Sequence, residues 1–365
     1  MRESRRLACI TLLAAALASA TPAFTAPASA TPAFTAPQSV PQKAAVRSAE
    51  PGSPDADRPT AEKEGGKRIL IENGTMLTFG DVLVNGPKGR TVFRWRDGIT
   101  VAAGERAVAL FSSEGAGVHP VRILLPALGG FTISFAAKPA DRMKIAAFAA
   151  EMEAASVPAR IRLYAGVDGS LFASVLEGAF TFRTKTDTHT IPAGGRILVS
   201  LDGTTAKADP EDRIEDVFGP EYTAWSSWNR TLEAKLADTT EMQVYARNVL
   251  SLAKDIAEAY SNTKTEYTVN RALYQSASEA WRTARSGESE TENEKKLRTQ
   301  FFSLQDRHRD LASRMISLGR TARTALRILI PENRWTGINP PTPLSEAELL
   351  LKACTERLEA LPDKP

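Results

Sequence analysis

The chain has 365 residues, which is enough for two domains of ordinary size. Its 46 lysines and arginines nearly balance its 43 aspartates and glutamates, so the net charge of +3 excludes a strong overall field for nucleic acid or an anionic membrane. Apolar residues make up 42% of the chain, which is ordinary for a globular protein. We therefore expect a folded protein with no nucleic-acid partner.

The N-terminus has the three parts of a secretory signal peptide. A basic start precedes an apolar run at residues 7–18, which is shorter than the roughly 20 residues needed to cross a bilayer. Two A-x-A cleavage signals follow, and they end at Ala20 and Ala30. We expect residues 1–20 to be the signal peptide, with cleavage at Ala30 as the open alternative. The mature chain would then be periplasmic or secreted, with no transmembrane segment, and its single cysteine, Cys354, would form no intramolecular disulfide.

Residues 21–67 are predicted to be a disordered linker. The sequence SATPAFTAP stands at 19–27 and again at 29–37, and it is followed by sequence rich in Pro, Ala, Ser and charge. Such a composition buries too little apolar area to offset the entropy of ordering the chain. We expect this segment to be a tether between the signal peptide and the folded part.

Residues 68–208 consist of short runs in which apolar and polar residues alternate. Between the runs stand pairs such as Asn73-Gly74, Asp97-Gly98 and Asp168-Gly169, which favour tight turns. Many short strands at close spacing predict an all-β domain. The stretch 141–155 is ambiguous, because its Ala and Glu content favours a helix while its position among strands favours β-structure.

From residue 209 to residue 331 the pattern is helical. Apolar and aromatic residues recur at alternating spacings of three and four from Trp225 to Trp281, and no Gly or Pro interrupts 221–286. We expect Ser286-Gly287 to end this helix and a capping box at Ser289–Glu292 to begin a second one with the same repeat.

Two such arms joined by a tight turn predict an antiparallel coiled-coil hairpin. Its longer arm would reach about 90 Å if it were unbroken. Residues 332–365 are predicted to form a Pro-rich spacer and a short C-terminal helix capped at Ser345. Because the β-type and helical halves share no periodicity, we expect them to fold separately.

An aromatic row on the first predicted helix is the most specific candidate site. Its members stand seven residues apart: Tyr260, Tyr267, Tyr274 and Trp281. A seam between two helices requires this spacing, so packing is the favoured interpretation. The alternative is a platform for a partner helix or a glycan. The sequence shows no catalytic, cofactor-binding or metal-ligating cluster, and its three histidines are far apart.

The β-type region contains a repeated phrase. Ser174-Val175-Leu176-Glu177-Gly178 is followed by Ile191-Pro192-Ala193-Gly194, and a weaker copy runs from Gly80 to Gly104. Over residues 69–205 the sequence resembles the FecR domain, a periplasmic domain whose recurring phrase is a V-L-E-G turn followed by an L-x-A-G turn. The resemblance implies a β-roll or solenoid-like fold in which each phrase forms one layer, with glycine at the corner.

These observations favour an exported, non-enzymatic interaction or scaffold protein of the cell envelope. The FecR-like domain would be its binding module, the helical hairpin would be a spacer or self-association arm, and the partner would be an envelope protein or a cell-wall component. One alternative is a cell-wall enzyme or enzyme activator, whose support is its exported location and two S-x-x-K strings at Ser251–Lys254 and Ser261–Lys264. Another is a FecR-type envelope signalling regulator, which would need an uncleaved N-terminus. Neither the partner nor the oligomeric state can be read from the sequence.

Overall fold

All described residues of the computed structural model belong to one unit, residues 39–365. The predicted signal peptide lies outside the described residues, as does most of the predicted linker. The structure describes residues 44–50, 58–63, 67–95, 98–114, 121–136, 143–207, 221–284, 291–331 and 340–359.

The β-rich part contains 17 strands within these described ranges. The strands are β1 (Ala44–Glu50), β2 (Thr60–Glu62), β3 (Arg68–Leu70), β4 (Met76–Leu77), β5 (Val82–Val84), β6 (Arg90–Arg94), β7 (Ile99–Ala103), β8 (Val108–Glu114), β9 (Val121–Phe135), β10 (Met143–Ala146), β11 (Glu151–Ala154), β12 (Ala159–Ala165), β13 (Leu171–Glu177), β14 (Ala179–Arg183), β15 (Thr188–Pro192), β16 (Arg196–Val199) and β17 (Thr205–Lys207). The stretch 143–154 is therefore β-structure, which resolves the ambiguity in the sequence.

The strands form two layers that share β9. One layer, named the helix-facing sheet, has the order β3-β2-β5-β8-β9-β10-β11-β14-β15. The other, named the far sheet, has the order β4-β1-β6-β7-β9-β12-β13-β16-β17. The sheet is mixed, because β9 and β10 run parallel while the other described pairs are antiparallel. Side chains of both layers meet in one core, where the Phe93 and Phe111 rings lie 4.9 Å apart.

Strand β9 passes from one layer to the other at Gly129. Before this residue the strand pairs with β8 in the helix-facing sheet, and from it onward it pairs with β12 in the far sheet. Gly129 has φ of +99°, and a Cβ atom here would lie 2.6 Å from the Cα of Ala107. Only glycine meets both conditions, because other residues rarely adopt this backbone angle and would collide with Ala107, the residue before β8.

The repeated phrase corresponds to a repeated strand unit. In the first copy β5 pairs with β8, and β6 and β7 form a hairpin in the opposite sheet. In the second copy β13 pairs with β16, and β14 and β15 form the hairpin, with the two sheets exchanged. Gly194 has a positive φ of +82°, but no atom lies within 4 Å of a Cβ added there. Glycine is therefore favoured at this position by the backbone angle and not by close packing. Solenoid-like stacking stays a prediction.

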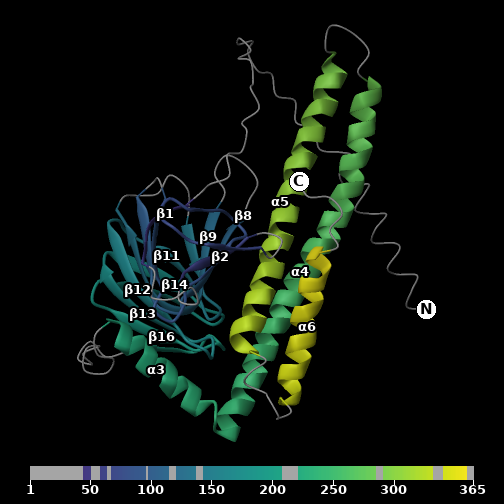
Figure 1. Ribbon diagram of the computed structural model, residues 1–365. Helices are drawn as coiled ribbons and strands as arrows, with labels where there is room; N and C mark the ends of the chain where they lie inside the picture. The colour runs from purple at the N-terminus through teal and green to yellow at the C-terminus, as the bar shows by residue number, and fades with distance from the viewer. Residues whose placement is uncertain are drawn as a thin grey trace. The chain divides into compact units, whose positions relative to one another are not determined.

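Four helices follow the strands: α3 (Glu221–Lys235), α4 (Thr239–Ala284), α5 (Glu292–Leu329) and α6 (Thr342–Glu359). Helices α4 and α5, named the helix pair, run antiparallel, and α6 packs against both (Figure 1). The unbroken arm expected over 221–286 is wrong. Helix α3 ends at Lys235. The carboxylate of Asp238 then accepts hydrogen bonds from the backbone N–H groups of Thr240 and Glu241, at 2.8 and 3.1 Å, and so caps the start of α4.

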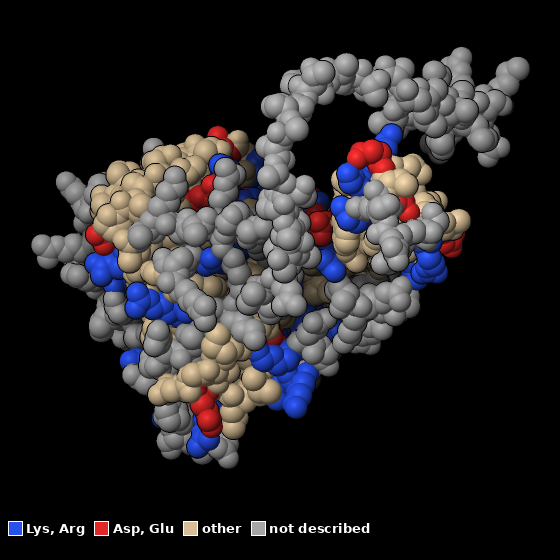
Figure 2. Space-filling model, turned by 90° about the horizontal axis from the view of Figure 1, so that it is seen from above, with Lys and Arg blue, Asp and Glu red and all other residues tan. Residues whose placement is uncertain are grey.

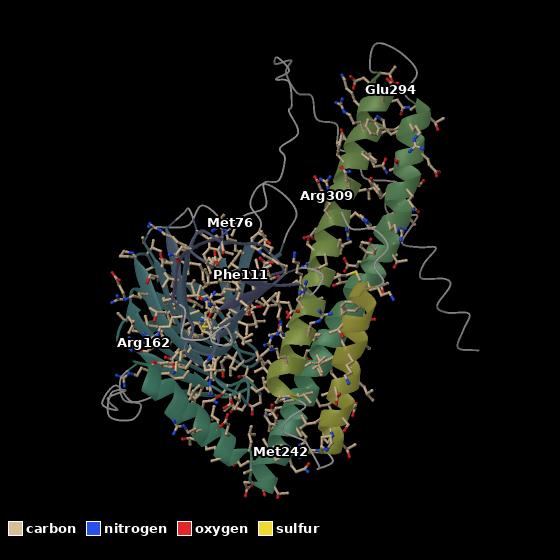
Figure 3. The ribbon with its side chains drawn as sticks, in the orientation of Figure 1. Met76, Phe111, Arg162, Met242, Glu294 and Arg309 are labelled. Carbon is tan, nitrogen blue, oxygen red and sulfur yellow. The ribbon has the colours of Figure 1, made fainter. Side chains whose placement is uncertain are left out.

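Two other predicted helix starts are displaced. The capping box of α5 is formed by Thr291 and Glu294, not by Ser289 and Glu292. Here Thr291 Oγ1 accepts from the N–H of Glu294 at 3.2 Å, and Glu294 accepts from the N–H of Thr291 at 2.5 Å. Helix α6 begins at Thr342, before the predicted cap at Ser345, and it has 18 residues. In Figure 3, Glu294 marks the end of the helix pair next to its connection, and Met242 marks the opposite end of α4.

Helices cover both sheets. The outer face of the helix-facing sheet, including Val108, Leu110 and Leu125, shares a second core with α4, α5 and α6. On the far sheet, Tyr164 and Phe172 pack near Trp228 of α3, and Asn229 accepts a hydrogen bond from the N–H of Val167 at 3.1 Å. The expectation of two separate halves is therefore not supported, because the β-rich part and the helices bury apolar side chains jointly.

The predicted order of β-structure followed by long helices is confirmed. The boundary at residue 67 is too late, because β1 and β2 lie inside the predicted linker and pair with β6 and β5. Backbone hydrogen bonds in a sheet do not require an apolar sequence, so these strands leave little trace in composition. The residues assigned to a Pro-rich spacer and a short helix include α6, which belongs to the helical core. The coiled coil stays a prediction.

Candidate functional site

The aromatic row lies at the contact between α4 and α5. The side chains of Tyr260 and Tyr267 are buried, with 1% and 5% of their surface exposed, while Tyr274 and Trp281 are half-buried. Two of the four rings are therefore enclosed by the protein itself. Neither Tyr260 nor Tyr267 is available as an open platform.

Rings of α5 stack on the row. The His308 imidazole lies between the rings of Tyr267 and Tyr274, at centroid distances of 4.5 and 5.6 Å. Phe301 continues the stack, at 5.2 Å from Tyr274 and 4.9 Å from Trp281. Aromatic contacts of this kind add to the stability gained from burial alone, so they hold the two helices in one register.

Polar groups accompany these rings inside the helix pair. The Asn270 amide donates a hydrogen bond to the carbonyl oxygen of Leu304 at 3.1 Å. Within the described part of the chain, the Tyr267 hydroxyl and the Asn270 Oδ1 have no hydrogen-bond partner from the protein. A buried polar residue in a helix seam costs stability but restricts how the helices can align.

The outer surface of the same region carries exposed apolar side chains. Val269 and Leu273 stand one helical turn apart on α4, and 58% and 53% of their surfaces are exposed. We name these two residues the outer apolar face. Phe302 on α5 and Leu349 on α6 are also exposed, but each lies on another helix. Leu349 is 71% exposed, so it is a matched single-residue reference for the outer apolar face.

The two S-x-x-K strings lie on α4 as ordinary helical turns. Ser251 and Ser261 are exposed, and the amino group of Lys254 pairs with Glu346 of α6 at 3.3 Å.

Among the described residues, no group of three or more His, Cys, Asp or Glu side chains is placed to hold a metal ion. The described helices also include none that is both long and apolar enough to cross a membrane.

A second group of side chains, named the charged joint, connects the β-rich part to α5. Its members are Glu62, Lys63, Arg68, Asp81, Arg320, Arg323 and Arg327. Lys63 pairs with the buried Asp81, while Arg320 donates a hydrogen bond to the carbonyl oxygen of Lys63 at 3.2 Å. Nearby, Ser112 of β8 and Ser317 of α5 are hydrogen-bonded. In Figure 2, basic and acidic side chains are interspersed over the visible face, and no broad patch of one sign covers that face.

The charged joint was not predicted from the sequence. Arg320, Arg323 and Arg327 follow one another at spacings of three and four, which places them on one face of α5. That pattern was visible in the sequence. Glu62 and Arg68, which lie close to this face of α5, stand about 260 positions earlier in the chain. No local sequence pattern predicts a contact between such distant segments.

Comparisons with known proteins define no family for this chain. No protein-family model matches it, and no curated protein matches it either. Among solved structures, it is similar to the crystal structure of a protein from Parabacteroides distasonis that is provisionally assigned as an anti-sigma factor. The identity is 14%, the TM-score is 0.29, and the match covers 35% of this chain and 59% of the other. The match thus spans less than two thirds of that protein, and a similarity of this size establishes neither a common fold nor a common function.

Proposed function

We propose that this protein is an exported, non-enzymatic interaction or scaffold protein of the cell envelope, and that the helix pair is its partner-binding arm. The observation that carries the proposal is the contrast across α4 in one short segment. Tyr267 is enclosed in the seam, whereas Val269 and Leu273, two and six residues further along α4, are exposed to solvent. A surface helix ordinarily directs its large apolar residues inward, so an exposed pair over a well-packed seam suits a contact with another molecule.

The arm has the stiffness that such a role requires. Helix α4 has 46 residues, which corresponds to about 70 Å at 1.5 Å per residue. The stacked rings of Tyr274, Phe301 and Trp281 lie toward the end of α4 at Ala284 and the start of α5 at Glu292. Figure 1 shows that this end of the helix pair extends past α6. A binding surface held rigid in advance loses less entropy when a partner binds.

Export, and the proposal that the β-rich part is a FecR-like module, rest on the sequence. The basic start, the short apolar run and the A-x-A signals support a cleaved signal peptide. The repeated strand unit supports a module built from two copies of one pattern. In this proposal the β-rich part is the base from which the helix pair extends, and the partner is an envelope protein or a cell-wall component.

The proposal is tested by affinity capture from envelope extracts with the mature chain as bait. The test variant carries Val269→Ser and Leu273→Ser, and the control carries Leu349→Ser on α6. We expect the double variant to keep its melting temperature, because both side chains are already exposed, and to lose a partner that the wild type and the control retain. Retention of every captured protein by the double variant would contradict the proposal.

Self-association through the helix pair is the form of the proposal in which the partner is a second copy. Sedimentation of the purified mature chain at increasing concentration distinguishes this form from a foreign partner. A dimer that dissociates in the Val269→Ser, Leu273→Ser variant would identify the partner as another copy. A monomer at all concentrations would leave the envelope partner as the proposed one.

A further inference from the structure

One carboxylate in the charged joint is shared by several guanidinium groups. Glu62 of β2 lies 3.7 Å from Arg323 and 3.8 Å from Arg320, and its other oxygen lies 4.0 Å from Arg68. These separations are longer than a charge-assisted hydrogen bond of about 2.7–2.9 Å. Glu62 therefore attracts three arginines without pairing closely with any one of them.

Arg327 brings a further positive charge to the same place. It stands one helical turn after Arg323 on α5 and is exposed. The pKa of Arg327 is lowered, first by desolvation and then by the positive charge of Arg68, while Glu62 acts in the opposite direction. Among the described carboxylates, none lies within ion-pair distance of Arg327. Arg68 of β3 and Arg327 of α5 thus lie near enough for their positive charges to repel, and the Glu62 carboxylate, which is within 4.0 Å of Arg68, lies near both.

Arg68 and Arg327 are both exposed. The side chain of Arg68 is 64% exposed, while Arg320 is buried and donates a hydrogen bond to the carbonyl oxygen of Lys63. Arg320 joins α5 to the residue that follows β2, and the exposed guanidinium groups of Arg68 and Arg327 are accessible to a ligand. Figure 1 shows β2 beside α5, which is the edge where this group lies.

We infer that Arg68 and Arg327 form a binding site for a phosphate group, with Arg323 at its margin. A guanidinium group offers paired donors that match phosphate oxygens, and the repulsion between neighbouring guanidinium groups is relieved when an anion binds to both. A phosphate dianion neutralises both charges, whereas a carboxylate neutralises one. The net charge of +3 for the whole chain conceals this local imbalance.

The test uses the purified mature chain and inorganic phosphate. Thermal melts are recorded in phosphate and in sodium chloride at equal ionic strength, because a ligand that binds the folded state raises the melting temperature. We expect a larger rise in phosphate for the wild type than for the Arg327→Gln and Arg68→Gln variants, because exclusion of phosphate from the protein surface stabilises all of them alike. Arg327→Gln and Arg68→Gln should each weaken apparent phosphate affinity by about tenfold or more, as expected from the loss of one charge-assisted contact. Arg309→Gln, whose side chain pairs with Asp306 on the distant part of α5, is the control and should bind as the wild type does.

Two outcomes would overturn the inference. One is equal stabilisation by chloride and phosphate, which would show general screening only. The other is unchanged phosphate affinity in both Arg327→Gln and Arg68→Gln. Because the two variants lie on different elements, α5 and β3, a folding defect in one leaves the other informative, and circular dichroism identifies such a defect.

The phosphate can belong to a lipid head group or to a soluble molecule, and a second arm separates these sources. Leu70, two residues after Arg68 on β3, is 46% exposed and would face a bilayer if lipid were the ligand. Co-sedimentation is measured with vesicles of phosphatidylglycerol and with vesicles of phosphatidylcholine. Binding to the former that is lost in Arg327→Gln identifies lipid phosphate. Binding to free phosphate without vesicle binding identifies a soluble source, and either result supports the site.

Discussion

The imidazole of His308 on α5 stacks on the ring of Tyr267 on α4, with centroids 4.5 Å apart and planes inclined by 28°. This relationship shows that the aromatic row serves first as the internal contact of the helix pair. The exposed apolar side chains of this region lie outside it, at Val269 and Leu273. The row supports the proposed binding surface by holding the helices together, and it does not form that surface.

Replacing Tyr267 with Ala should destabilise the protein by about 2–4 kcal/mol, because the ring is buried and stacked on His308. Glu266→Ala is the matched control on the neighbouring residue. Its carboxylate pairs with Arg307 at 3.7 Å with both side chains more than half exposed, so the change should be under about 0.5 kcal/mol. Denaturant unfolding of both variants measures the difference. Equal and negligible shifts would show that the row is not a seam.

The helix pair was largely predictable from the sequence. The spacing of three and four residues selects one face of each helix, and the buried residues Ala246, Val249, Ala253 and Ile256 follow it. The break at 236–238 was not predicted, because no Gly or Pro marks it. The signal there was Asp238 followed by two threonines, which suits a helix start as well as a helix interior.

Gly129→Ala should cost about 3–5 kcal/mol, because a Cβ atom at this position would meet the Cα of Ala107 at 2.6 Å. Gly80→Ala is the control. Gly80 also has a positive φ, of +90°, but no atom lies within 4 Å of the added Cβ, so backbone strain alone should cost about 1–2 kcal/mol. Thermal melts of the two variants separate the collision from the strain. A similar loss of stability in both variants would mean that β9 does not depend on its close approach to Ala107.

The β-rich part should not form a stable monomer without its helices. A fragment of residues 44–207 would expose the face that includes Val108, Leu110 and Leu125, which the helices cover in the whole chain. We expect this fragment to self-associate or to melt without a sharp transition, as sedimentation and circular dichroism would show. Changing Val108 and Leu110 to Thr in the fragment should reduce the association. A monomeric fragment that melts as cooperatively as the whole chain would contradict the shared core.

This shared core had a signal in the sequence. Residues 107–111 are Ala-Val-Ala-Leu-Phe, a continuous apolar run, and the structure buries all five. A strand buried on one face alternates, whereas a continuous run indicates burial on both faces. The strands β1 and β2 and the charged joint had no comparable signal, because both depend on which distant segments pair.

Export is tested by the N-terminus of the mature chain. Cleavage after Ala20 or Ala30 should leave Thr21 or Thr31 as the first residue of the exported protein. N-terminal sequencing of protein purified from the envelope fraction identifies which site is used. An intact Met1 in that fraction would contradict the signal peptide and favour the anchored regulator.

Site-specific photocrosslinking in the envelope of the producing cells tests the proposed function most directly. A photoreactive residue is placed at Leu273 of the outer apolar face in one variant and at Leu349 of α6 in another, since both leucines are more than half exposed on helices. The proposal predicts a discrete crosslinked product from position 273, identifiable by mass spectrometry, and none of that mass from position 349. Crosslinks of equal yield from both positions, or from position 349 alone, would contradict the assignment of the helix pair as the binding arm.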